Sequence, residues 1–483
     1  MRNQRKPATL LALLFCFATA ISWADEVEKP TSSTPEPAAP CPANKNPGPT
    51  PLSGNVKKGL EFLVEHQDSS GGWGQGGGWR QGGKSGGRVE GTQVQDPPDV
   101  GSTCIAVLAL IRAGSSPKEG PYATHITKGI DFVLEHVEHA DDKSVYVTDI
   151  RDTQLQVKIG RYVDTFLAGL VLSELKGRMP DEKSNARVTA ALAKTIKKIE
   201  LNQNADGTFA GNTGWASVLS LGLCSKALNR AKGAGVAVSE ETLQRDYKQA
   251  LAALEPKTVS AGVGAGIGGG VSGKLAVTAP AASAVAADAI RIAGPVAGPV
   301  ATPAAQTLAR PLAATEPSDA GVKIYNEGAN TSRLDEFVQG NRREKAEAEL
   351  VLQDSAAPAD KKVKAQSKLS QLAGVEKSQK DAVDGIMRKL DDKSFIQGFG
   401  NNGGEEYLSY MNISETLAGR GGAEWERWNK NIALSINRVQ NQDGSWSGDH
   451  CITGRTFCTG AALLTLMADR APTALAAKEQ VQK

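Results

Sequence analysis

Aromatic residues and histidine are scarce in this sequence, and neither sign of charge predominates. Only 5% of the 483 residues are aromatic and five are histidine, while 55 basic residues nearly balance 53 acidic ones. A near-neutral chain lacks the basic excess with which proteins bind nucleic acid or anionic membranes. We therefore expect no nucleic-acid partner. Alanine and leucine are abundant instead, and both favour helices.

Long apolar runs are also lacking, apart from one at the N-terminus. Basic residues precede an apolar stretch at 8–21, and the small-x-small pattern at 22–24 comes before Asp25. These are the marks of a secretory signal peptide, and about 14 apolar residues fall short of the roughly 20 that span a bilayer. We expect residues 1–24 to be cleaved, the mature protein to be secreted or periplasmic, and no stable membrane span to remain.

Composition divides the mature chain. Residues 25–52 and 257–320 are rich in small residues and proline, and they lack the bulk to pack a core. The expected organisation is a disordered tether (25–52), a helical part (53–256), a disordered Ala/Gly/Pro-rich insertion (257–320), a second helical part (321–470) with a charged helical segment (341–389), and a C-terminal tail (471–483).

One motif occurs three times between expected helices. Gln67, Gln203 and Gln440 are each followed four positions later by glycine and six positions later by an aromatic residue. Glycine adopts the left-handed conformation that ends a helix, and the aromatic side chain covers the outgoing turn. Three copies in phase predict stacked helical pairs, because one such pair cannot bury its apolar face alone.

The spacing Gln-x3-Gly-x-Trp after a Lys-Gly-x2-Phe-Leu helix, as at 58–73, resembles the glutamine–tryptophan repeat of the prenyltransferase and squalene cyclase (terpenoid cyclase) family. The resemblance covers most of the mature chain. It implies an all-α fold, an (α/α)6 toroid of helical hairpin repeats in which about six pairs close a ring. It implies no particular activity, because the toroid serves both enzymes and binding modules.

In such a toroid the second helix of each pair lines the inner wall. Cys104, Asp164 and Cys458 each lie six positions before a leucine of an expected second helix, and Ser217 takes this place in a fourth. The resemblance therefore implies one rim that carries thiol and polar groups, and Asp164, Cys104 and Cys458 are our catalytic candidates. The alternative is that small polar residues simply cap these helices.

A possible zinc site precedes the last inner helix. Protein prenyltransferase β subunits bind zinc through an Asp-x-Cys pair and a distant histidine; Asp449 and Cys451 resemble the pair, and Cys458 stands where the family has histidine. With His450 they offer the carboxylate, imidazole and thiolate ligands that suit zinc. The sequence thus indicates either a zinc site at Asp449, His450, Cys451 and Cys458, or no cofactor, with Cys451 and Cys458 joined in a disulfide or left free.

Motifs of terpenoid chemistry are missing. The sequence has no Asp-x-Asp-Asp run and no Asp-Asp-x-x-Asp run, and few aromatic residues could line a carbocation cavity. We interpret the chain as a non-catalytic binding or structural toroid whose partner is an unknown extracytoplasmic ligand or protein. The alternatives are an enzyme with a thiol or zinc site on the inner rim, and a carbohydrate-active toroid that pairs Asp164 with Glu405 or Glu406.

Overall fold

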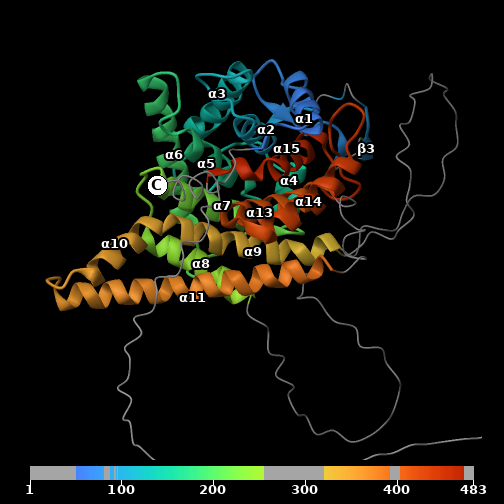
Figure 1. The fold of residues 1–483 in the computed structure, drawn as a ribbon. Coiled ribbons are helices and arrows are strands. Elements are labelled where there is room, and N and C mark those ends of the chain that lie inside the picture. Colours follow the sequence, from blue (N-terminus) through green and yellow to red (C-terminus); the bar gives the residue numbers. More distant parts are fainter. Residues whose placement is uncertain are drawn as a thin grey trace, which may run out of the picture. The chain divides into compact units, whose positions relative to one another are not determined.

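The computed structural model describes residues 50–80, 87–91, 94, 96–254, 320–391 and 403–472. The expected signal peptide, nearly all of the tether and insertion, and most of the tail lie outside these residues. The described part is mostly helical, as the all-α prediction requires (Figure 1).

The helices of the described part have the following bounds: α1 (Gly54–Glu65), α2 (Val100–Arg112), α3 (Ala123–His139), α4 (Gln154–Ile159), α5 (Val163–Leu175), α6 (Glu182–Asn202), α7 (Ser217–Gly233), α8 (Glu240–Leu254), α9 (Ala320–Gly340), α10 (Arg342–Gln353), α11 (Ala359–Lys389), α13 (Gly404–Arg420), α14 (Gly422–Arg438) and α15 (Arg455–Leu466). Two small antiparallel ribbons join α1 to α2. In these ribbons β1 (Trp73–Gly74) pairs with β4 (Pro98–Asp99), and β2 (Gly78–Arg80) pairs with β3 (Gly87–Val89).

Six helices pack on one another in sequence. The helix α2 packs on α5, α5 on α7, α7 on α9, α9 on α13, α13 on α15, and α15 again on α2. Every residue of α2 and of α5 is buried, as expected for helices that are covered on all sides. The amphipathic helices α1, α3, α6, α8, α11 and α14 each pack on one of these six.

The turn motif has the predicted local structure. Gly71, Gly207 and Gly444 have φ angles of 91°, 81° and 84°, in the left-handed region. The aromatic residues that follow are buried, with Trp73 and Trp446 fully covered. The left-handed glycine and the buried aromatic residue are therefore confirmed at all three turns. The prediction that this glycine ends the helix was wrong, because α1, α6 and α14 end five or six residues earlier, at Glu65, Asn202 and Arg438.

The first and last of these turns make the same hydrogen bonds. The Gln67 amide donates to Gly71 O at 2.8 Å and to His125 O, in α3, at 2.9 Å. The Gln440 amide donates to Gly444 O at 2.8 Å and to Asn55 O, in α1, at 2.9 Å. Thus the last turn contacts the first helix as the first turn contacts the third helix.

Charged side chains fill the space between the packed helices near their C-terminal ends. Six buried residues from α2, α5, α7, α9 and α13 form one ion-pair network: Arg112, Glu174, Lys226, Arg230, Glu336 and Glu415. Lys226 Nζ lies 2.7 Å from Glu415 Oε2, and Arg230 Nη1 lies 2.6 Å from Glu174 Oε1. The three cations and three anions balance, which offsets the cost of burying each charge.

The ion-pair network also determines whether its acidic members are protonated. Burial alone would favour a neutral Glu415, but Lys226, Arg230 and Arg112 outweigh burial and lower the pKa of that carboxyl. The Glu415 carboxylate joins α13 to α7 through Lys226 and to α2 through Arg112. The helices are therefore tied across the middle of the bundle as well as to their neighbours.

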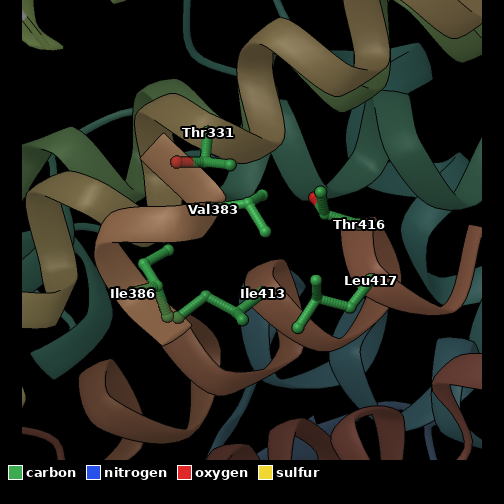
Figure 2. Close-up of a pocket in the computed structure, with 6 residues that line it drawn as sticks. All are labelled: Thr331, Val383, Ile386, Ile413, Thr416 and Leu417. Atoms are coloured by element: carbon green, nitrogen blue, oxygen red, sulfur yellow. The ribbon is translucent and has the colours of Figure 1, made fainter. Parts of the chain in front are cut away.

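The charged helical segment predicted at 341–389 forms a hairpin of α10 and α11, and one face of α11 is buried. The helix α11 packs on α9, and its buried side chains include Leu372, Val375, Val383 and Ile386. A narrow crevice remains between α9, α11 and α13 (Figure 2). It has no room for a water molecule, and apolar side chains such as Ile386 and Ile413 line most of it. It is a packing defect, not a ligand cavity.

Candidate metal centre

The loop at 447–454, between α14 and α15, lies against the N-terminus of α13. Gly404 N donates to Ile452 O at 2.8 Å, and Ile452 N donates to Glu405 Oε2 at 3.2 Å. Gly403 permits this approach, because a Cβ there would lie 2.5 Å from His450 O. The first turn of α13 and this loop are therefore held as one unit.

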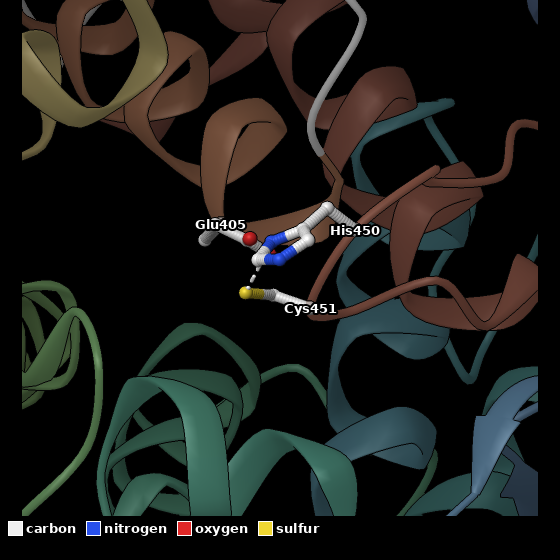
Figure 3. Close-up of side chains that lie close together, drawn as sticks. All are labelled: Glu405, His450 and Cys451. Atoms are coloured by element: carbon white, nitrogen blue, oxygen red, sulfur yellow. Dashed lines mark hydrogen bonds between the residues drawn. The ribbon is translucent and has the colours of Figure 1, made fainter. Parts of the chain in front are cut away.

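Glu405, His450 and Cys451 meet at this junction. One ligand atom from each of the three lies within 4.8 Å of the other two, and Figure 3 shows their side chains gathered together. Cys451 Sγ lies 2.8 Å from His450 Nδ1. Glu405 and Cys451 are buried while His450 is exposed, so the group is open on the imidazole side. Carboxylate, imidazole and thiolate in one place are a possible metal-binding triad.

Burial shapes the proton affinities of the triad. It raises the pKa of Glu405 to about 7. Burial, and then the charge of Glu405, raise the pKa of Cys451 to about 12. Ionisation of the buried Glu405 carboxyl or Cys451 thiol costs free energy, and a bound cation would offset that cost. Cys451 also has a φ of 58°, which is uncommon for a residue with a side chain.

Two of the four predicted zinc ligands, His450 and Cys451, belong to this triad. Asp449 is exposed and lies outside it. Cys458 is fully buried in the first turn of α15, where its thiol donates to Ile452 O at 3.3 Å. Cys451 and Cys458 are both free thiols, so the structure contains no disulfide between them. Glu405 replaces Asp449 as the carboxylate that meets the imidazole and the thiol.

The other catalytic candidates lie around the N-terminus of α2. Asp164, in the first turn of α5, is buried and accepts a 2.6 Å hydrogen bond from Gln156 Nε2. Burial, and then the charges of Asp164 and Asp99, raise the pKa of Cys104, so these three groups lie near one another. Asp164 and Cys104 thus lie near each other in the structure. A catalytic role for them, or for Cys458, stays a prediction.

Sequence reasoning missed Asp99. It is the N-cap of α2, where its carboxylate accepts from Ser102 N at 2.7 Å. A Cβ on Gly101 would lie 2.8 Å from Asp164 Oδ1 and 3.4 Å from Asp99 Oδ1, which places the two carboxylates on either side of one glycine. Burial, and then the charge of Asp164, raise the pKa of Asp99 to about 7. The sequence signal that could have identified it is an aspartate directly before an apolar helix, where N-cap residues usually lie.

The chain was compared with protein families, curated proteins and solved structures. No family model, no curated protein and no solved structure matches the chain. Among the described residues, no helix combines the length and the apolar character that crossing a membrane requires. We therefore infer a function from the residues themselves.

Proposed function

We propose that the protein is an exported (α/α)6 toroid that acts as a binding or structural module and holds a zinc ion at Glu405, His450 and Cys451. The observation that carries the proposal is the convergence of three different donor types within 4.8 Å from two segments of the chain. The partner is an extracytoplasmic ligand or protein.

The packing order supports a toroid. The inner helices follow one another from α2 to α15, and α15 packs again on α2. The hydrogen bond from Gln440 to Asn55 repeats the bond from Gln67 to His125. A bond that joins neighbouring pairs within the chain thus also joins its last pair to its first, as closure of a ring requires.

The filled centre favours a module over terpenoid chemistry. A cyclase of the squalene cyclase family, which the repeat resembles, needs an apolar cavity inside the ring. Here Lys226, Arg230 and Glu415 occupy the middle of the bundle as part of a balanced ion-pair network, and α7 contacts α13 directly. The surface left for recognition is therefore the rim, where the triad lies.

Zinc suits the triad because zinc accepts oxygen, nitrogen and sulfur ligands together. The Glu405 carboxylate and the Cys451 thiolate would balance the charge of the dication in a buried place, which favours binding. Three protein ligands leave one of the four usual positions for water or for an atom of the partner. His450 is exposed, so solvent reaches the triad from the imidazole side.

Metal content of the purified mature protein tests the site. We expect about one zinc per chain after equilibration with zinc, and a cobalt–thiolate absorption band after cobalt exchange. Cys451→Ser should abolish the band, and His450→Ala should weaken metal binding at least about tenfold. Two matched controls, Cys224→Ser in the buried core and His139→Ala on the exposed end of α3, should bind metal as the wild type does. Equal loss in variants and controls, or no bound metal at all, would refute the zinc site.

The N-terminus of the protein recovered from the extracytoplasmic fraction tests export. We expect the first residue to be Asp25. Recovery of an uncleaved chain from the cytoplasm alone would contradict export.

A further inference from the structure

The short helix α4 lies at the N-termini of the inner helices α2, α5 and α7. Its Gln156 Nε2 donates to Asp164 Oδ2 at 2.6 Å and to Ile150 O at 2.9 Å. The Leu155 side chain lies over Gly101, where its Cδ1 would be 2.8 Å from an added Cβ. Because Cys104 follows Gly101 by one helical turn, it lies on the same face of α2. The α4 segment therefore covers Asp99, Asp164 and Cys104.

The same helix connects three other parts of the rim. Gln154 Nε2 donates to Trp79 O at 2.8 Å, and Lys158 O accepts from Ala216 N, just before α7, at 2.9 Å. Burial raises the pKa of Cys451 and the charge of Lys158 opposes that rise, so Lys158 lies near the metal centre. The six-residue helix α4 thus contacts the β2–β3 ribbon, α2, α5 and the start of α7.

The backbone on both sides of α4 has unusual geometry. Asp152, just before the cap residue Thr153, has a φ of 62°, and Gly160, just after the helix, has a φ of 129°. Uncommon backbone conformations cluster at active sites, ligand clamps and switch regions, and hinges are a few residues at the ends of elements that absorb a change in φ and ψ. Asp152 is exposed, so its own side chain does not oppose rotation there. Gly160 is buried beside Ser220 and Asn212 and is therefore the anchored end of the segment.

We propose that α4 is a hinged lid that opens as a unit between Asp152 and Gly160 and exposes Asp99, Asp164 and Cys104, with the Gln156–Asp164 hydrogen bond as its latch. Opening does not require metal at the triad, and it does not require the rest of the fold to unfold. The lid controls access to the rim beside the metal centre.

The chain contains an internal reference for this motion. Cys104 and Cys224 are both free and fully buried. Cys224 lies in α7, close enough to Asp246 and Arg333 for their charges to influence its pKa. Local opening of the lid exposes Cys104 alone, whereas global unfolding exposes both thiols.

The test is alkylation of the full-length mature protein with N-ethylmaleimide, with the rate at each cysteine measured by peptide mass spectrometry. We expect Cys104 to react at least about tenfold faster than Cys224 in the wild type. Gln156→Ala, which removes the latch, should accelerate Cys104 a further tenfold or so and leave Cys224 unchanged. Gln366→Ala, on the exposed face of α11, should change neither rate.

A second variant acts on the hinge instead of the latch. Asp152→Gly removes the strain of the positive φ and loosens the hinge, so it should accelerate Cys104 severalfold without changing Cys224. Equal rates for Cys104 and Cys224 in the wild type and in both variants would overturn the proposal. Acceleration of both cysteines together would also overturn it, because global unfolding would then account for the exposure.

Discussion

Gln440 and Asn55 hydrogen-bond to each other in both directions across 385 positions of sequence. The Gln440 amide donates to Asn55 O at 2.9 Å, and Asn55 Nδ2 donates to Gln440 Oε1 at 2.6 Å. A third bond runs from Gln440 Nε2 to Gly444 O. One side chain thus fixes its own turn and joins that turn to the first helix, so the two ends of the folded region stabilise each other.

Gln440→Ala should therefore lower the free energy of unfolding by about 1–3 kcal/mol, since it leaves partly buried groups of α1 and the turn without partners. The measurement is urea unfolding followed by circular dichroism. Gln366→Ala, on the exposed face of α11, is the control and should change stability by less than about 0.5 kcal/mol. Equal stability of the two variants would show that the contact between the ends contributes nothing.

A glycine-to-alanine pair tests the turn itself. Gly444 has a φ of 84°, and a Cβ there would lie 2.5 Å from Lys58 O. Both the strained backbone and the clash should make Gly444→Ala destabilising by about 2 kcal/mol or more. Gly374, inside α11, has no atom near its added Cβ, so Gly374→Ala should stabilise by up to about 1 kcal/mol. Thermal unfolding should move in opposite directions for the two variants, and a shared direction would contradict the argument.

The ion-pair network makes a separate prediction. Glu415→Gln keeps the shape of the side chain but leaves Lys226 and Arg112 with too little negative charge in a buried place. Removal of one partner from such a group costs about 3–5 kcal/mol, so the variant should unfold at a much lower urea concentration. Glu426→Gln, on the exposed face of α14, should unfold as the wild type does. A Glu415→Gln protein of normal stability would mean that the network is not formed.

How much the sequence could predict depends on how local each feature is. The turns at Gln67, Gln203 and Gln440 were predictable because glycine and the aromatic residue act within six positions of the glutamine. The link from Gln440 to Asn55 was not, since the partner belongs to another helical pair. Likewise His450 and Cys451 stood out as neighbours, whereas Glu405 lies 45 positions earlier and joins them only because Gly403 lets the loop approach α13.

The buried charges were harder still to predict from sequence. Glu174, Glu336 and Glu415 belong to three different helices, and nothing within any one of these helices indicates the partner of its glutamate. Only the packing of five helices brings them against Arg112, Lys226 and Arg230. An ion-pair network of this kind carries no periodic signal, because each helix contributes only one or two members.

The pH dependence of stability should reveal the buried carboxyl of Asp99. Burial, and then the charge of Asp164, raise its folded-state pKa to about 7, against an ordinary value of 3.8. Between about pH 4 and pH 7 the folded chain therefore keeps a proton that the unfolded chain has lost. Stability from this group is present at low pH and is lost as the pH rises toward 7.

Asp99→Asn removes the titration and keeps the cap, because asparagine caps a helix N-terminus as well as aspartate does. Its stability relative to the wild type should rise from pH 4 to pH 7 by up to about 4 kcal/mol, the equivalent of roughly three pKa units. Urea unfolding of both proteins across this range measures the difference, and the comparison cancels other acids that titrate in both. A difference that stays constant with pH would mean that Asp99 is ionised in the folded protein, and the close approach of Asp99 to Asp164 would then need another explanation.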